Sequence, residues 1–293
     1  MTREAGPLSS VAAVVLSSRP VSWINTAFPF AAAYLLTTRE LDAIAVVGFV
    51  YFLIPYNLAM YGINDVFDYA SDLANPRKGG IEGALLDPRL HRTTIWAAVL
   101  TNVPFLVFLY AVGTAAAWLA LTVVLFAVVA YSAPGLRFKE RPILDSATSS
   151  LHFVGPAIVG LTLAHAPVTP GAILVLLAFF LWGMAAHAFG AVQDIVPDRE
   201  AGIASVATAL GATTTVRLAL LLWLAAGVVM LATPWPAPLG AALALPYIVN
   251  AAPWHDVGDA DAASTNRAWR RFIALNYVSG FLATMLVILA WIS

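Results

Sequence analysis

The sequence predicts an all-α fold, a polytopic membrane bundle of about nine transmembrane helices. Hydrophobic residues make up 61% of the 293 residues and charged residues only 11%. Ordinary soluble domains are nearer 45 to 50% apolar. Apolar windows long enough to cross a bilayer also recur along the whole chain. No linker or low-complexity segment separates these windows, so we expect residues 1–293 to form a single domain.

The apolar windows predict the elements in order. They lie near residues 11–36, 42–70, 92–112, 114–132, 143–165, 171–194, 213–233, 238–252 and 269–292. The eighth window is the weakest of the set, because it is short and flanked by prolines. We expect the nine helices to surround a central cavity.

The positive charges predict how the bundle sits in the plasma membrane. Of the 15 Lys and Arg residues, all but Arg39 fall near the N-terminus or in loops after even-numbered helices. By the positive-inside rule the N-terminus is then cytoplasmic and, with nine spans, the C-terminus is outside. The acid-rich loops therefore share the cytoplasmic face, where we expect the functional site.

The chain has no cysteine. This excludes disulfides, thiolate metal sites and cysteine nucleophiles. Any bound metal must therefore be a hard cation held by oxygen ligands.

An acidic motif closes the second apolar window. An α-helix turns by about 100° per residue. Four residues therefore share one face, at roughly 0°, 40°, 80° and 100° around the helix: Asn64, Asp68, Asp72 and Asp65. Such a face can hold a divalent cation. Because exposing a carboxylate to lipid costs about 3 kcal/mol, the motif should face a polar cavity or the interface. The alternative interpretation is an ordinary solvated helix end.

The loop that follows this motif places two cations beside it. Arg77 and Lys78 are followed by Gly79, Gly80 and Gly83. A mixture of acids and cations suits a phosphate ester, because Mg²⁺ binds carboxylates and phosphate oxygens while Arg and Lys take the remaining oxygens. Alternatively, the two cations only mark the cytoplasmic side.

The sixth window ends in a second acidic pair, Asp194 and Asp198. Pro197 should end or kink the helix before Asp198, which then reaches the site from a loop. The two acidic clusters are interpreted as two halves of one site. In contrast, Asp256, Asp259 and Asp261 in the last cytoplasmic loop are interpreted as solvated charges.

Small residues follow the same helical stripe into the membrane. Gly190, His187 and Gly183 lie at the i−4, i−7 and i−11 positions from Asp194. We expect the glycines to leave room for a chain-shaped ligand. His187 is either a functional group or a histidine that hydrogen-bonds within the bundle.

Two further polar segments are candidates for ligand binding. Between the fourth and fifth windows, Arg137 and Lys139 could point together toward a phosphate from an extended loop. Asn25 interrupts the apolar first window and is a candidate cavity-lining group. The alternatives are a topology signal for the cations and a bond to a neighbouring helix for Asn25.

Together, these motifs resemble those of the UbiA superfamily of intramembrane prenyltransferases. The similarity rests on Asn64-x₃-Asp68-x₃-Asp72 after the second window, Asp194-x₃-Asp198 after the sixth, and the nine predicted spans. Residues 18–29, 61–69, 75–80 and 131–142 further resemble one branch, the lycopene elongases of C50 carotenoid biosynthesis.

The resemblance implies a Mg²⁺-dependent prenyltransferase. It implies that Mg²⁺ on an allylic diphosphate would be held by Asn64, Asp68, Asp72, Asp194 and Asp198. Asp65 is a further candidate ligand, because it lies on the same helix face as the first motif. The groups implied to bind the diphosphate are Arg77, Lys78, Arg137 and Lys139, with Tyr131 nearby.

The implied reaction transfers the dimethylallyl group of dimethylallyl diphosphate to the ends of lycopene and releases diphosphate. Loss of diphosphate would leave an allylic cation, which the terminal alkene of the acceptor attacks. Aromatic faces can stabilise such a cation, and Tyr61, Tyr69 and Trp182 lie near the acidic helix ends. The alternative role for these aromatic residues is packing or interface anchoring.

Other functions remain open at this point. A related enzyme with an aromatic or quinone-precursor acceptor would share every metal motif. A secondary transporter is a different class, but its substrate groups lie near the membrane midplane. We expect the partners to be a prenyl diphosphate, a lipid-soluble acceptor and membrane lipids, with no nucleic acid. A noncatalytic role beside a partner subunit or carotenoid-pathway enzyme also remains open.

Overall fold

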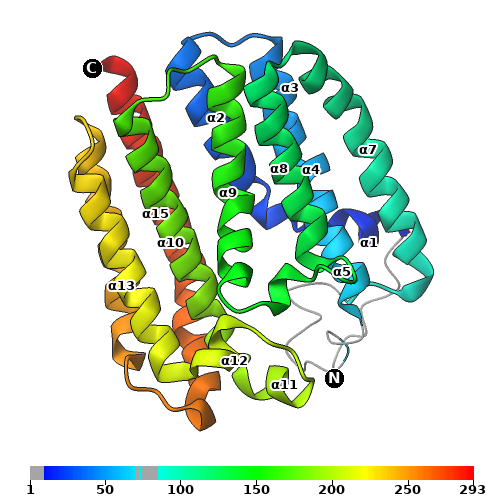
Figure 1. The fold of residues 1–293 in the computed structure, drawn as a ribbon, viewed down its shortest axis with the longest axis vertical. Helices are drawn as coiled ribbons and strands as arrows, with labels where there is room; N and C mark the ends of the chain where they lie inside the picture. The colour runs from blue at the N-terminus through cyan, green and yellow to red at the C-terminus, as the bar shows by residue number, and fades with distance from the viewer. Residues whose placement is uncertain (1–9, 70–72, 74–84) are drawn as a thin grey trace, which may run out of the picture.

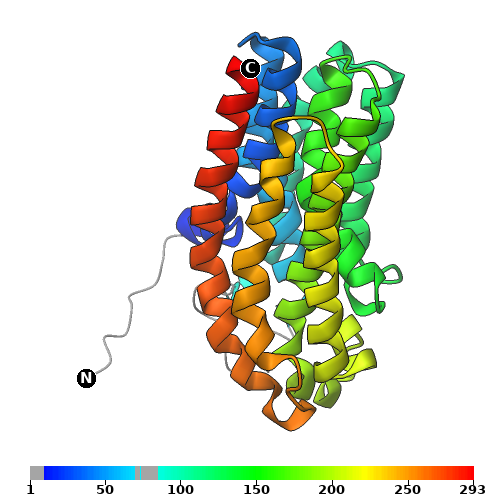
Figure 2. The ribbon, with the colours of Figure 1, turned by 90° about the vertical axis from the view of Figure 1, so that its left-hand side faces the viewer.

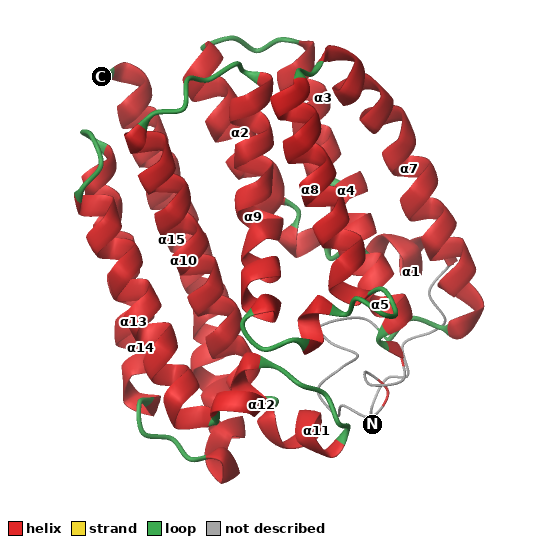
Figure 3. Cartoon of the chain, in the orientation of Figure 1, coloured by secondary structure: helices red, strands yellow, loops and turns green. Residues whose placement is uncertain are grey.

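The computed structural model describes residues 10–69, 73 and 85–293. Within these residues all regular structure is helical and no strand occurs. The long helices run side by side along the longest axis of the molecule (Figures 1, 2 and 3). The predicted all-α membrane bundle is confirmed.

The first half of the chain combines long helices with short helical segments. In chain order they are α1 (Ser10–Ser17), η1 (Pro20–Ser22), α2 (Ile24–Thr38), α3 (Ala43–Leu53), α4 (Pro55–Asn57), η2 (Leu58–Gly62), α5 (Ile63–Phe67), η3 (Pro88–Leu90), α7 (His91–Val112) and α8 (Ala115–Ser132).

The second half begins after a short turn, η4 (Phe138–Glu140). Its helices are α9 (Leu144–Leu163), α10 (Pro170–Val192), α11 (Ile195–Glu200), α12 (Val206–Leu210), α13 (Ala212–Leu231), η5 (Ala237–Ala244), α14 (Leu245–Ala251), η6 (Ala252–Trp254), η7 (Asp259–Thr265) and α15 (Asn266–Ile292).

Six helical stretches of the described residues are long and apolar enough to cross a membrane. They are Ala43–Phe67, Pro88–Val112, Ala115–Ser132, Pro170–Val192, Ala212–Leu231 and Asp259–Ile292. The chain is therefore a multi-pass membrane protein, and the exact number of nine crossings stays a prediction.

The first predicted window is not one helix. Helix α1 ends at Ser17, and Arg19 takes a left-handed backbone conformation with φ of 52°. Pro20 follows and cannot donate the hydrogen bond that would continue the helix. The chain therefore turns before α2 begins at Ile24.

Side-chain caps fix the ends of three helices opposite the acidic motifs. The Asp42 carboxylate accepts from the backbone N–H of Ala45 at 2.8 Å and so caps α3. Thr114 and Thr169 cap α8 and α10 in the same way. Such caps satisfy N–H groups that have no partner within the helix.

The stretch Ala43–Phe67 is a single helical rod with two irregularities. Pro55 lacks the N–H needed for the preceding turn. The Asn57 side chain instead donates to the carbonyls of Phe52 and Leu53, at 2.8 and 3.1 Å. Directly afterwards, η2 is a wide π-helical turn. The irregular backbone is thus satisfied within the protein, as a membrane requires.

Two apolar cores meet at the centre of the molecule. One core joins α2, α3, η2, α7, α8 and α9, and the other joins α10 to α15. Helix α9 packs against α2, α8 and α10, while α10 packs against α13. The pair α9 and α10 is therefore the seam between the two halves.

The ends of the helices that carry the acidic motifs lie at one end of the bundle. In Figure 1, α5, α11 and α12 are at the lower end, and the C-terminal end of α15 is at the upper end. The fold thus places at the same end of the bundle two motifs that are far apart in the sequence.

Candidate active site

The first acidic motif lies where α5 ends. The helix ends at Phe67, and Asp68 follows it with its backbone N–H bonded to the Asn64 carbonyl at 2.9 Å. Asp72, Arg77 and Lys78 lie outside the described residues. The described part of the motif is therefore Asn64, Asp65 and Asp68.

The basic loop between α8 and α9 reaches this motif. The ammonium of Lys139 forms an ion pair with Asp68, and Arg137 Nη2 lies 3.8 Å from the same carboxylate oxygen. Lys139 also donates to Asn64 Oδ1 at 3.5 Å, and Arg137 forms an ion pair with Glu140. The structure thus brings together four residues that the sequence predicted for one site.

The loop is not extended, as the sequence analysis expected. Arg137 has a φ of 40° and starts the tight turn η4. Its left-handed backbone reverses the chain, so Arg137 and Lys139 converge through the turn rather than by strand alternation. The conformation was predicted wrongly, while the shared direction of the two cations was predicted correctly.

Burial affects the charge of Lys139. Only 12% of its side chain is exposed. Burial lowers the pKa of Lys139 to about 8, while the carboxylates of Glu140 and Asp65 act in the opposite direction. A poorly hydrated ammonium gains much from an anion beside it. Lys139 is therefore suited to bind a phosphate oxygen.

Asp65 has a separate partner. Its carboxylate is buried and accepts from Arg19 Nη2 at 3.1 Å. The Arg19 guanidinium also lies over the ring of Tyr61, 4.4 Å from its centroid. Arg19 was missed by the sequence analysis because it precedes α2, far from the motif along the chain.

Ser132 is a second missed residue. Its hydroxyl donates to Asn64 Oδ1 at 2.8 Å, from the last residue of α8. The Asn64 amide oxygen is thereby fixed between a hydroxyl and the Lys139 ammonium. A lone serine at a helix end carries no signal that could have revealed this contact.

The second acidic motif lies on a short helix. Helix α10 ends at Val192, and α11 begins at Ile195 with Asp194 directly before it. Pro197 occupies the first turn of α11, where a missing N–H costs nothing. The break therefore comes before Asp194 rather than before Asp198, and Asp198 is helical rather than in a loop.

Buried polar groups line the seam behind the motifs. Tyr131 and His187 are joined through Oη and Nε2 at 3.2 Å, and His187 Nδ1 lies 3.1 Å from Ser146 Oγ. The ring of His152 packs edge-on against Tyr131, with a centroid distance of 5.3 Å. His187 therefore hydrogen-bonds within the bundle, and Tyr131 lies beside Ser132 and the first motif.

The glycine stripe of α10 does not leave room for a ligand. A Cβ atom on Gly183 would lie 2.3 Å from Ser150 Oγ, and one on Gly190 would lie 2.8 Å from the Trp269 ring. The missing side chains thus allow α10 to pack closely against α9 and α15. This corrects the interpretation drawn from the sequence.

The remaining candidates are Asn25, Trp182 and Tyr69, the last of which directly follows Asp68. Asn25 is exposed in the first turn of α2, and no hydrogen bond of its side chain is found among the described residues. Trp182 packs against Tyr247 and Phe272, as an aromatic residue of the core does. Tyr69 packs edge-on against His91.

Within the described ranges, no three acidic or histidine side chains are close enough to hold a metal ion by themselves. The donors at this end of the bundle are nonetheless carboxylate and amide oxygens, the ligand type that Mg²⁺ prefers. Mg²⁺ commonly binds through one or two carboxylates together with phosphate oxygens of a substrate. The described residues fit such a shared site.

Comparisons with known proteins agree on one family. A model of the UbiA prenyltransferase family matches residues 26–291. A C(50) beta-cyclic carotenoids biosynthesis protein, LbtBC, from Dietzia sp. is 56% identical over 94% of this chain, and the match spans 65% of that protein's length. A lycopene elongase/hydratase from Corynebacterium glutamicum is 49% identical over 96% of this chain and 98% of its own length.

Solved structures share the fold. A UbiA homolog from Archaeoglobus fulgidus bound to DMAPP and Mg²⁺ has a TM-score of 0.63 and 21% identity, and the match covers 91% of this chain and 98% of that one. The apo structure of a UbiA homolog from Aeropyrum pernix K1 also has a TM-score of 0.63, with 18% identity and coverage of 91% and 99%.

Proposed function

Because the chain belongs to the UbiA prenyltransferase family, it is a membrane prenyltransferase, and we propose that it acts as a lycopene elongase. The proposed reaction transfers a dimethylallyl group from dimethylallyl diphosphate to each end of lycopene and gives C45 and C50 carotenoids. The observation that carries this proposal is the end-to-end similarity to the Corynebacterium glutamicum lycopene elongase/hydratase.

We propose that both acidic motifs hold Mg²⁺ together with the donor diphosphate. Asn64, Asp68, Asp194 and Asp198 would supply oxygen ligands, with Asp72 outside the described residues. When bound, Mg²⁺ would neutralise charge on the departing diphosphate. Asp65 would join this set only if its ion pair with Arg19 opened, so Asp65→Asn should cost less activity than Asp68→Asn.

The basic groups of the η4 loop have two roles in the proposal. Lys139 and Arg137 orient the Asp68 carboxylate, and their charges would stabilise the diphosphate as it leaves. Arg77 and Lys78, which lie outside the described residues, are proposed to bind the same group.

The proposed chemistry is an ionisation followed by an addition. The C–O bond of the donor breaks, the electron pair leaves with diphosphate, and an allylic cation remains. The terminal alkene of the acceptor then supplies the electrons of the new C–C bond. Because this alkene is the nucleophile, no strong base is needed to start the reaction. The resulting tertiary cation ends by losing a proton or capturing water.

The acceptor is tested by mass spectrometry of pigments from a lycopene-accumulating host that expresses the chain. We expect carotenoids heavier by one and two five-carbon units, and their absence with Asp68→Asn and with Asp194→Asn. A product that also carries water would identify capture of the cation by water. Unchanged lycopene, with verified expression, would instead favour an aromatic or quinone-precursor acceptor.

A further inference from the structure

Helix α11 carries Asp198 but is too short to be stable alone. It has six residues, and isolated helices need more than about 12 to form in water. Helix α11 packs against α12 and η7. The direction in which α11 presents its acidic side chains is therefore set by contacts with these neighbours.

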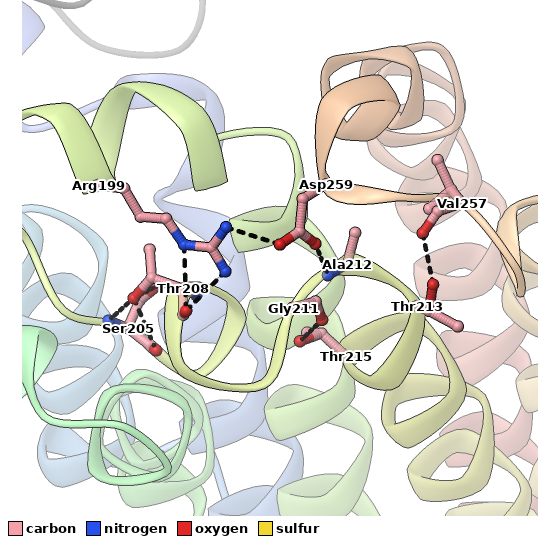
Figure 4. Close-up of polar contacts among 9 residues, drawn as sticks. All are labelled: Arg199, Ser205, Thr208, Gly211, Ala212, Thr213, Thr215, Val257 and Asp259. Atoms are coloured by element: carbon pink, nitrogen blue, oxygen red, sulfur yellow. Dashed lines mark hydrogen bonds and ion pairs between the residues drawn. The ribbon is translucent and has the colours of Figure 1, made fainter.

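Arg199 provides the polar part of these contacts (Figure 4). Its Nε and Nη2 donate to the carbonyl of Thr208, the middle residue of α12, at 3.3 and 3.0 Å. Its Nη1 donates to Asp259 Oδ2 at 2.6 Å, in the first turn of η7. One guanidinium thus connects α11 to two other segments.

Asp259 extends the connection to a membrane-spanning helix. Its second oxygen accepts from the backbone N–H of Ala212 at 2.6 Å, where α13 begins. The residue before Ala212 is Gly211, which has no side chain to cap the helix. Asp259 therefore caps α13 from another loop, which corrects the interpretation of this residue as a solvated charge.

The position of Arg199 on α11 separates it from the acids. Asp194 and Asp198 are four residues apart and share one side of the helical turn. Arg199 is rotated about 100° from Asp198 and faces α12 and η7. Contacts at Arg199 can thus set the rotation of α11 without blocking its acidic side.

The contact is also exposed to solvent. The side chains of Arg199 and Asp259 are 45% and 39% exposed. Ion pairs of this exposure contribute little to global stability. Their removal should therefore affect the local geometry of α11 more than the folding of the bundle.

We propose that Arg199 and Asp259 are positioning residues that fix α11 and so place Asp194 and Asp198 for metal and diphosphate binding. This inference rests on the proposed function, because it takes the second acidic motif as part of the binding site. Neither residue contacts the substrate in this proposal.

The test compares Arg199→Gln, Arg199→Lys and Asp259→Asn in the full-length detergent-solubilised protein. Asp259→Asn keeps an oxygen for the Ala212 N–H but removes the charge that pairs with Arg199. The matched control is Arg217→Gln, because Arg217 donates to the His255 carbonyl at 2.9 Å and forms no hydrogen bond or ion pair with α11 among the described residues.

Two quantities are measured. The first is the Mg²⁺ concentration that half-saturates the thermal stabilisation given by a non-hydrolysable dimethylallyl thiolodiphosphate. The second is the division of any activity loss between KM for the donor and kcat. For Arg199→Gln and Asp259→Asn we expect the Mg²⁺ requirement to rise about five-fold, which corresponds to about 1 kcal/mol. The KM for the donor should rise, and the Tm without ligand should fall only slightly. Arg199→Lys should fall between these variants and the wild type.

The outcomes separate the inference from the proposed acceptor. Wild-type protein that binds Mg²⁺ and the donor analogue but makes no elongated carotenoid would contradict the acceptor and leave this test intact. An unchanged Mg²⁺ requirement in both variants, or an equal change in Arg217→Gln, would overturn the positioning role. The same follows if wild-type protein shows no Mg²⁺-dependent binding of the analogue.

Discussion

Lys139 and Arg137 approach the same carboxylate oxygen of Asp68 from one tight turn. Glu140 also pairs with Arg137, so two cations face two acids and these four charges sum to zero. The ammonium and the guanidinium nonetheless have more N–H donors than these acids occupy, and the remaining donors suit the oxygens of an anionic ligand such as a diphosphate. At the scale of single residues, the first motif and its basic loop therefore act as one unit.

We predict that Lys139→Met weakens donor binding. Loss of a hydrogen bond to a charged group costs about 1.5 to 3 kcal/mol, so kcat/KM for the donor should fall roughly 10- to 150-fold. Lys139→Arg is the control, since it keeps a cation and should lose less. Initial rates at varied donor concentration measure the effect, and an unchanged kcat/KM in Lys139→Met would contradict it.

We predict that Tyr131→Phe destabilises the seam. The substitution leaves His187 Nε2 without the hydroxyl that it contacts at 3.2 Å. A buried polar group that loses its partner costs about 1 to 3 kcal/mol. Tyr110→Phe is the control, because the hydroxyl contact of Tyr110 with Thr122 is exposed. Thermal unfolding in detergent should show a clear loss of Tm only for Tyr131→Phe.

The sequence revealed part of this site and could not reveal the rest. Acids and cations beside membrane-length helices need a polar partner. This made four residues of the site predictable: Asn64, Asp68, Arg137 and Lys139. Arg19 and Ser132 were not, because their contacts join segments 46 and 68 residues apart. Asp145, buried at the start of α9, accepts from the Val206 N–H, although its position predicts only a helix-end acid.

Helices were predictable as elements, but their interruptions and packing were less so. All nine apolar windows contain helix at nearly the expected residues. The break at Arg19 was missed although Ser18, Arg19 and Pro20 interrupt the apolar stretch, and Pro20 is the signal that could have revealed it. The glycines of α10 were misinterpreted because a small residue permits either a ligand or a close neighbour, and composition does not distinguish the two.

We predict that Gly183→Ala destabilises the contact of α9 with α10. The added methyl group would lie 2.3 Å from Ser150 Oγ, and overpacking of this kind costs about 1 to 3 kcal/mol. Ser150→Ala in the same chain should recover part of the loss. Gly280→Ala is the control, since a Cβ there meets no atom within 4 Å. A lower acceptor affinity with unchanged Tm would support the ligand interpretation instead.

We predict that the cap of α13 by Asp259 is lost in acid. The hydrogen bond from the Ala212 N–H, followed by the Arg199 guanidinium, lowers the pKa of Asp259. Its stabilisation is therefore complete above the ordinary pKa of about 3.9 and is lost as the pH falls through the lowered value.

Because the ion pair is exposed, the Tm difference between wild type and Asp259→Asn should be small. It should stay constant from about pH 8 to pH 5 and disappear below about pH 4. Thermal unfolding of the detergent-solubilised protein across this range measures it. A difference that is unchanged at pH 3 would show that the charge of Asp259 does not contribute.

At the scale of the whole molecule, two apolar cores join along α9 and α10, and both acidic motifs lie at one end. The sequence predicted this common end from the distribution of charge alone. It could not specify how the halves meet, because that depends on shape complementarity along the seam rather than on charge.

We predict that the end with the acidic motifs is cytoplasmic. The natural chain has no cysteine, so single reporters can be introduced at Val168, which is 86% exposed between α9 and α10, and at Ala201, exposed at the end of α11. A membrane-impermeant maleimide should label Val168→Cys in intact cells and Ala201→Cys only after lysis. The opposite pattern would reverse the orientation.

The wide turn η2 has a consequence for how this protein tolerates changes in length. A π-helical turn holds one more residue than a regular α-helical turn. Beyond it the helix continues on the same path, but each position is occupied by the residue one later in the sequence than in a regular helix. Without η2, a regular helix from Pro55 onward would present Ile63 and Phe67 where Asn64 and Asp68 now face Ser132 and Lys139. Loss of one residue within Leu58–Gly62 would only restore a regular turn, whereas loss of one between Asn64 and Asp68 would change the spacing of the motif itself. The helix therefore contains one place where evolution can remove a residue and keep the site intact.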